Sequence, residues 1–163
     1  MNQTEWVSKF EEFSSLDELP EADRKLIEQA RQSVMSAYAP YSRFSVGAAV
    51  LLENGKVMLG NNQENASYPI GLCAERVAVF AAAANFPGIK MKAIAITALS
   101  KQFLIDKPIT PCGACRQAIA EYEHRYQHPI RLIMVGETGK VLVSDSIRNF
   151  LPYQFNGDDL KAK

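Results

Sequence analysis

The chain has 163 residues, of which 47% are hydrophobic, and 18 basic residues balance 18 acidic ones to give a formal net charge of zero. This length favours one domain, residues 21–163, preceded by an N-terminal extension over residues 1–20. Zero net charge argues against nucleic acid or an anionic membrane as partner, because both require basic surfaces. No apolar run approaches the ~18 residues of a membrane span, and residues 1–20 lack the apolar core of a signal peptide.

Two helices are expected before residue 40. The spacing of Trp6, Phe10 and Phe13 favours a short helix over residues 4–13. A better helical pattern begins at Pro20 and stops before Pro40, with acidic residues in its first turn. Its apolar stripe comprises Leu26, Ile27, Ala30, Val34, Ala37 and Tyr38.

The rest of the chain alternates strands with helices. A hairpin is predicted over residues 46–60, because Asn54-Gly55 separates two strand-like runs. The following elements are a helix over 73–85, a strand over 92–99, a helix over 112–126, strands over 130–135 and 139–143, and a short helix over 147–151. This order predicts an α/β fold with a central sheet covered on both faces.

The three cysteines form the most informative pattern. Cys73 starts the run Cys-Ala-Glu-Arg, and Cys112 and Cys115 lie in Pro-Cys-Gly-Ala-Cys-Arg. Three thiolates can hold zinc and leave its fourth position open, as in catalytic zinc sites. Glu75 is then placed to shuttle protons beside the metal, and Arg76 to donate hydrogen bonds to the thiolates. Both motifs start helices, whose N-terminal dipoles offset part of the thiolate charge.

Other interpretations of these residues remain. Cys112 and Cys115 alone could form a redox dithiol, but this leaves Cys73 and Glu75 unexplained. A structural zinc site would need a fourth ligand such as His124 or His128, which lie in a polar stretch typical of a solvated surface.

Together these motifs resemble the cytidine deaminase family. The resemblance covers residues 19 to about 160 and includes the segments 41–49 and 62–68. It implies a three-layer α-β-α sandwich with a central mixed sheet of five strands, and Zn²⁺ as the cofactor. The three-cysteine ligand set is similar to that of the small branch of the family, which implies a homotetramer with active sites at subunit interfaces.

The resemblance also implies how substrate is held. Asn62 and Glu64 would hold the ribose 3′-hydroxyl, the Ala66 backbone would hold the base, and Phe44 would stack on the pyrimidine. Phe155 would reach into a neighbouring subunit's pocket. The full set of implied substrate contacts is Phe44, Asn62, Glu64, Ala66, Tyr68 and Phe155.

The implied reaction is hydrolysis of cytidine or deoxycytidine to uridine or deoxyuridine, for pyrimidine salvage in the cytoplasm. Glu75 takes a proton from the activated water, which attacks C4, and Glu75 then delivers protons to N3 and to the departing ammonia. A runner-up is deamination of a nucleoside-like antibiotic such as blasticidin S, against which Glu64 argues. A polynucleotide-editing deaminase is disfavoured by the neutral charge and by Glu64, which would repel a 3′-phosphate. A non-catalytic zinc scaffold would have no need of Glu75.

Overall fold

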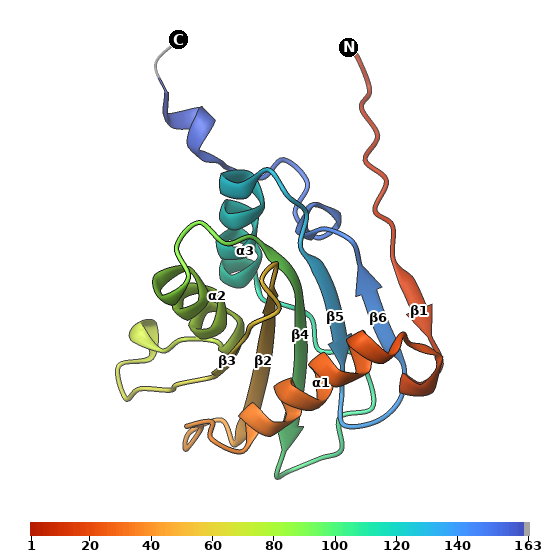
Figure 1. Ribbon diagram of the computed structural model, residues 1–163, viewed down its shortest axis with the longest axis vertical. Coiled ribbons are helices and arrows are strands. Elements are labelled where there is room, and N and C mark those ends of the chain that lie inside the picture. The colour runs from red at the N-terminus through yellow and green to blue at the C-terminus, as the bar shows by residue number, and fades with distance from the viewer. Residues whose placement is uncertain (162–163) are drawn as a thin grey trace.

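The computed structural model describes residues 1–161 and forms one mixed β-sheet between layers of helices (Figure 1). The strands lie in the order β1-β6-β5-β4-β2-β3, and only β4 and β5 are parallel neighbours. The strands are β1 (Glu11–Phe13), β2 (Phe44–Leu52), β3 (Val57–Asn61), β4 (Met91–Ser100), β5 (Arg131–Val135) and β6 (Val141–Ser144). The α-helices are α1 (Glu21–Val34), α2 (Ala74–Asn85) and α3 (Gly113–Tyr126).

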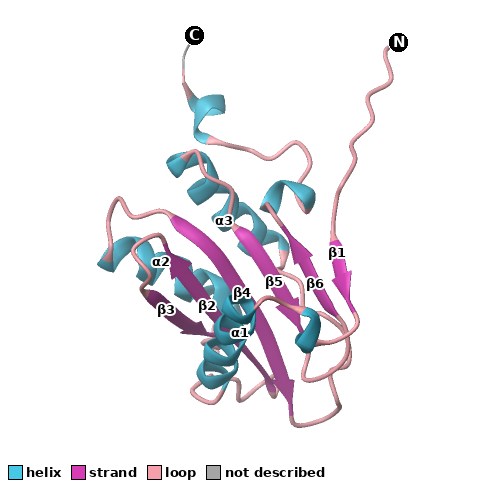
Figure 2. Cartoon of the chain, turned by 45° about the vertical axis from the view of Figure 1, so that its right-hand side comes forward, coloured by secondary structure: helices cyan, strands magenta, loops and turns pink. Residues whose placement is uncertain are grey.

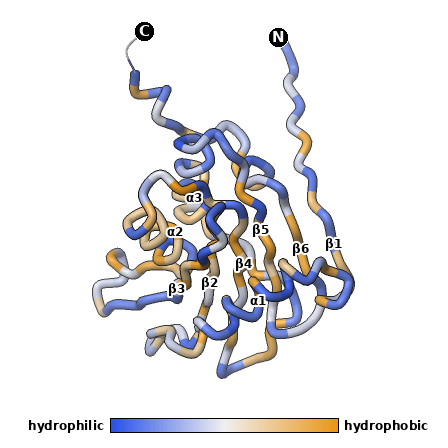
Figure 3. Tube along the Cα trace, in the orientation of Figure 1, coloured by the Kyte–Doolittle hydropathy of each residue, from blue (hydrophilic) through white to orange (hydrophobic). Residues whose placement is uncertain are grey.

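One face of the sheet is covered by α1, which crosses it in front in Figure 1. The predicted apolar stripe is buried as far as Val34, where the helix ends; Tyr38 lies beyond it and is exposed. Leu26, Ile27 and Ala30 pack against small and branched residues of the central strands. In Figure 3 the hydrophobic colour is concentrated on the strands, and among the described residues no helix is long and apolar enough to cross a membrane.

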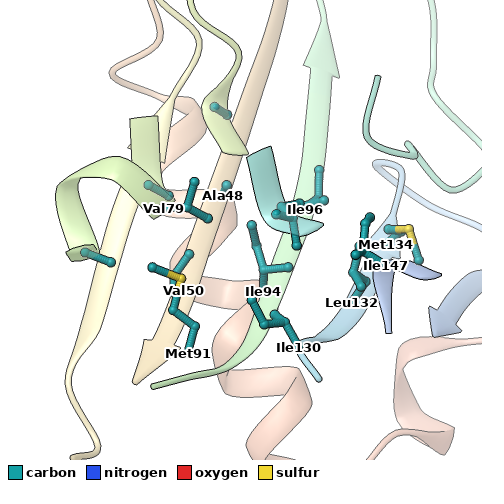
Figure 4. Close-up of a cluster of buried hydrophobic side chains, with 14 of the residues drawn as sticks. Ala48, Val50, Val79, Met91, Ile94, Ile96, Ile130, Leu132, Met134 and Ile147 are labelled. Carbon is teal, nitrogen blue, oxygen red and sulfur yellow. The ribbon is translucent and has the colours of Figure 1, made fainter. Parts of the chain in front are cut away.

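The opposite face is covered by α2 and α3, which gives the predicted three layers (Figure 2). Ala78 and Val79 from α2 meet Val50 and Ile94 from the sheet in a cluster of fully buried side chains (Figure 4). This cluster fixes both helices relative to the sheet, because interiors packed at crystal-like density resist displacement.

The sheet has six strands, not the five expected. The additional strand β1 comes from the N-terminal extension and pairs antiparallel with β6, Glu12 opposite Leu142. The predicted helix over residues 4–13 was wrong, since residues 11–13 are extended and residues 1–10 form no helix. Phe13 packs beside the α1 side of the core, so tertiary pairing overrides the helical spacing. The expected helix over 147–151 is one 3-10 turn, Ile147–Asn149, and residues 162 and 163 of the predicted domain lie outside the described residues.

The order of the strands brings α2 and α3 to the same edge of the sheet. β3 and β4 each pair antiparallel with β2, so they run in the same direction. Because α2 follows β3 and α3 follows β4, both helices begin beyond the carboxyl ends of parallel strands. Open α/β sheets commonly bind their ligands at this edge.

Gly60 sets how closely α2 approaches β3. A Cβ atom at this position would lie 2.5 Å from both the Ala74 carbonyl oxygen and the Ala78 nitrogen. We therefore expect Gly60→Ala to lower the free energy of unfolding by about 3 kcal/mol, since backbone atoms cannot move aside as a flexible side chain can. Chemical denaturation would measure this loss. Gly157→Ala is the matched control, because no atom lies within 4 Å of the Cβ position there; equal stability of the two variants would contradict the close-packing argument.

Candidate metal centre and active site

Three cysteine sulfurs meet where α2 and α3 begin. Cys73 and Cys112 are the N-cap residues of these helices, and Cys115 is buried in the first turn of α3. The Sγ atoms of Cys73 and Cys112 lie 3.8 Å apart, and those of Cys112 and Cys115 lie 3.5 Å apart. All three sulfurs fall within 4.8 Å of one another. The structure thus joins the two motifs that the sequence separates by 39 residues.

These distances fit a tetrahedral metal. Zinc bound by thiolates at about 2.3 Å in tetrahedral geometry requires sulfur pairs about 3.8 Å apart. The N-cap backbone at Cys73 and Cys112 is extended, and neither side chain accepts a capping hydrogen bond, so both sulfurs are available as ligands. Among residues 1–161, no histidine or carboxylate joins this cluster. A site with three protein ligands leaves one position for a reactant.

The electrostatics of the cluster favour a thiolate at Cys73. The pKa of Cys73 is lowered to about 5, mainly by a hydrogen bond from the Cys115 thiol. Partial burial opposes this shift, and Arg76 adds to it. Donation of that same hydrogen bond, together with burial, raises the pKa of Cys115. The Arg76 guanidinium lies 3.9 Å from the Cys73 sulfur and also donates to the Gly71 carbonyl at 3.2 Å. The Arg76 guanidinium therefore offsets part of the thiolate charge.

Glu75 lies beside the sulfurs and is buried, with 5% of its surface exposed. Burial raises the pKa of its carboxyl group. A backbone hydrogen bond opposes this shift in part, and the charge on Cys73 adds to it. A carboxyl group with a raised pKa binds a proton more readily than a free carboxyl group and can return it to a reacting group. It contributes to the lining of the same cavity as Cys73 and Cys112.

This cavity has a volume of about 570 Å³, which suits a small organic ligand. Its lining includes Cys73, Cys112 and Glu75. The segment after β3 adds Asn62, Glu64 and Tyr68 to the same lining. The cavity therefore joins a metal site to a polar wall.

Glu64 is held in place by the turn that precedes β2. Its Oε2 atom accepts hydrogen bonds from the backbone amides of Tyr41 at 2.9 Å and Ser42 at 3.3 Å. Partial burial acts to raise its pKa, but the Ser42 hydroxyl and these two amides together hold the pKa below its ordinary value. Glu64 is therefore an anchored carboxylate, and in the described structure no protein donor contacts its Oε1 atom. The sequence analysis missed Tyr41 and Ser42, which act here through backbone groups.

Asn62 is partly committed to the backbone. Its Oδ1 accepts from the Val46 amide at 2.8 Å, and its Nδ2 donates to the Phe44 carbonyl at 2.9 Å. These bonds hold the start of β2 against the cavity wall and leave one amide hydrogen for a ligand. Phe44 does not line the cavity but lies on the same strand face as Val46, which does.

The remaining predicted residues lie at the surface. Tyr68 lines the cavity mouth with 73% of its surface exposed and makes an edge-on contact with Tyr41, 5.6 Å between ring centroids. Ala66 is exposed and outside the lining. Phe155 is 57% exposed and lines a different cavity, of about 430 Å³, beneath the C-terminal tail. Phe155 is thus not part of the cavity lined by Cys73 and Cys112 of its own chain.

Comparison with known proteins agrees with this geometry. Residues 20–127, which include all three cysteines, match the family profile described as the cytidine and deoxycytidylate deaminase zinc-binding region. The chain belongs to this family. It is 40% identical over 136 residues to a cytidine deaminase of Halalkalibacterium halodurans, covering 83% of this chain and 95% of that protein. It is 36% identical over 146 residues to one of Mycobacterium tuberculosis, covering 87% and 96% respectively.

The fold also matches solved structures of the family. A crystal structure of cytidine deaminase from Burkholderia pseudomallei superposes with a TM-score of 0.70 at 41% identity, covering 80% of this chain and 97% of that one. The family match identifies the sulfur cluster as the cytidine deaminase zinc site and so favours zinc over a redox dithiol. The alternative histidine ligands are not in the cluster, since His124 instead lies 3.5 Å from the Asp158 carboxylate.

Proposed function

We propose that this chain catalyses the zinc-dependent hydrolysis of cytidine and deoxycytidine to uridine and deoxyuridine, with release of ammonia, in pyrimidine salvage. The observation that supports this most strongly is the position of buried Glu75 beside three sulfurs at tetrahedral spacing, in a cavity large enough for a nucleoside. Membership of the deaminase family supports the same reaction.

Cys73, Cys112 and Cys115 would hold zinc, which supplies Lewis-acid activation of water. In our proposal Glu75 takes a proton from that water and delivers it to N3 of the cytosine ring. As the water oxygen bonds to C4, its second proton passes through Glu75 to the amino group, and the C4–N bond breaks to release ammonia. Burial supports this double role, because it raises the pKa of the Glu75 carboxyl group and so makes the protonated form easier to reach during the reaction.

The polar wall would hold the sugar. Glu64, anchored by two backbone amides, offers its Oε1 atom to the ribose 3′-hydroxyl, and Asn62 offers its remaining amide hydrogen. An ionised Glu64 accepts from a hydroxyl and repels a phosphate, which favours a free nucleoside over a polynucleotide. The remaining proposed substrate contacts come from Tyr68, the Ala66 backbone and Phe44. The Phe44 ring would have to shift toward the cavity to make its contact.

An ultraviolet assay on cytidine, deoxycytidine, cytosine and blasticidin S, with metal analysis of the same sample, tests this function. We expect turnover of both nucleosides, little turnover of cytosine, and one zinc per chain. Preferential turnover of blasticidin S would favour the antibiotic-deaminase alternative. Full activity in metal-free protein would overturn the proposal.

Glu64→Ala is expected to lower kcat/KM for cytidine by about 100-fold and to leave the slow turnover of free cytosine within about twofold of wild type. Loss of a hydrogen bond to a charged partner, including the neighbours left unpaired, supports an effect of this size. Steady-state kinetics on both substrates measures the split. Glu53→Ala, an exposed carboxylate on the β2–β3 turn, is the control. Equal losses on nucleoside and base would remove Glu64 from the sugar site.

We further propose a homotetramer whose subunits meet beside the active site. Exposed Tyr68, Ile70 and Leu72 border the cavity, and exposed Phe155 projects from the tail, so these apolar surfaces are suited to burial against other copies. Light scattering coupled to size exclusion would give the mass, and Phe155→Ala would raise KM if this ring reaches a neighbour's cavity. A monomer of full activity would contradict both points.

We propose a cytoplasmic location because the cysteines are free thiols. All three are free in the structure, and their role as metal ligands requires reduced thiols. Fractionation of the source cells with an antibody against the chain would test it, and recovery in an oxidising compartment would count against it.

A further inference from the structure

The N-terminal arm, residues 1–13, lies outside the segment that matches the deaminase family, yet it is attached to the domain at two places. Its β1 strand pairs with β6 at the edge of the sheet. Before β1, the Ser8 hydroxyl donates to the Asn149 carbonyl at 2.7 Å, and the Lys9 amide donates to the Asn149 side chain at 3.1 Å. The two ends of the chain leave the domain at the same end of the molecule (Figure 1 and Figure 2).

These attachments place Phe10 on Phe150. The two rings meet edge-on, with centroids 4.8 Å apart and planes at 66°. Only part of Phe10 is covered, since 42% of its surface stays exposed. The contact therefore contributes little to the hydrophobic core. Phe150 itself packs against the buried core cluster, and Phe10 adds an edge-on contact to its ring.

The Phe150 residue in turn holds Arg116. The guanidinium carbon of Arg116 lies 5.2 Å from the centre of the Phe150 ring, and Nη1 donates to the Phe150 carbonyl at 3.2 Å. None of the ion pairs among residues 1–161 includes Arg116. Its orientation therefore depends on the ring and on backbone carbonyls. A planar guanidinium stacked on a ring and donating through several N–H groups has a fixed direction.

Arg116 closes the loop that carries two of the zinc ligands. Its Nε donates to the Pro111 carbonyl at 2.8 Å. Pro111 immediately precedes Cys112, and Arg116 immediately follows Cys115, so this hydrogen bond ties together the two ends of the Cys112–Cys115 segment, in addition to the helical bond from the Arg116 amide to the Cys112 carbonyl at 2.9 Å. A displaced guanidinium would release the carbonyl and allow Cys112, which is exposed, to move away from the other sulfurs.

We propose that the N-terminal arm is a positioning element of the zinc site, in which Phe10 acts through Phe150 and Arg116 to fix the loop of Cys112 and Cys115. The inference rests on the zinc site of the proposed function. It assigns the arm a role in retention of the metal, while substrate binding is left to the polar wall of the cavity.

Zinc release into a chromogenic chelator tests the proposal on the full-length, zinc-loaded protein. We expect Phe10→Ala to speed release about three- to tenfold, which is smaller than the 10–100-fold effect typical of groups that directly contact metal ligands. KM for cytidine should stay within twofold of wild type. Trp6→Ala is the matched control: Trp6 also pairs an aromatic ring with the C-terminal segment, at Tyr153, but among the described residues its ring forms no aromatic or cation–π pair with Phe150 or Arg116.

A double-mutant cycle separates positioning from general destabilisation. Arg116→Lys keeps the charge but loses the stacked, multiple-donor geometry. If Phe10 acts through Arg116, Phe10→Ala should add less than twofold to the release rate in the Arg116→Lys background. Phe10→Tyr should restore slow release. Additive effects, or wild-type release from Phe10→Ala, would overturn the proposal. Zinc bound by the wild-type protein would still support the proposed function in that case.

Discussion

Glu75→Gln is expected to keep one zinc per chain and to lower kcat for cytidine by about 10²–10⁴-fold, the range attributed to a positioned proton-transfer group. Glutamine has nearly the same shape, and Glu75 is not among the residues that gather around the metal site as ligands. The fold should not suffer, because burial already disfavours the ionised form of Glu75, as its raised pKa indicates. Metal analysis, thermal unfolding and steady-state kinetics on one preparation measure all three quantities.

The chain offers a matched control for this experiment in Glu123, which is equally buried at 5% exposure. Glu123 accepts hydrogen bonds from the Ile130 and Ile147 amides and from the Ser146 hydroxyl, and it lies near the opposite end of α3 from the zinc ligands. Glu123→Gln should therefore lower the melting temperature and leave kcat unchanged. If Glu75→Gln kept near-normal turnover, Glu75 would lose its role as proton shuttle.

The sequence could predict the metal centre because its determinants are local. Each cysteine motif spans one turn at the start of a helix, and this places Cys73 and Cys112 at N-caps whatever the rest of the chain does. The alternation of strands and helices was enough to predict a central sheet covered on both faces. The Asn54-Gly55 pair predicted the β2–β3 turn, where Gly55 adopts a left-handed conformation with φ of 81°.

The features that the sequence did not predict depend on contacts between distant segments. β1 is three residues long and is stabilised by pairing with β6, which lies more than a hundred residues away. The anchoring of Glu64 uses backbone amides of Tyr41 and Ser42, and backbone donors leave no mark in the residue pattern. The stacking of Arg116 on Phe150 likewise joins residues 34 positions apart. Local periodicity carries no information on such pairings.

Cys112→Ala is expected to weaken zinc binding by more than about 100-fold, since loss of a group that merely supports a ligand already costs 10–100-fold. Activity should fall in parallel with zinc content. The fold should persist, because α2 and α3 are held by the buried cluster on their face of the sheet and Cys112 makes no capping hydrogen bond that alanine would lose. Competition with a chelator of known affinity measures the zinc affinity, and circular dichroism measures the fold.

The comparison with Cys115→Ala separates metal binding from packing. Cys112 is exposed whereas Cys115 is completely buried, so both variants should lose zinc but only Cys115→Ala should also lose about 1 kcal/mol of packing in the zinc-free state. Urea denaturation of zinc-free wild type and both variants gives this difference directly. A Cys112→Ala protein that kept stoichiometric zinc and full turnover would show that the three sulfurs, though gathered at tetrahedral spacing, are not the ligands on which catalysis depends.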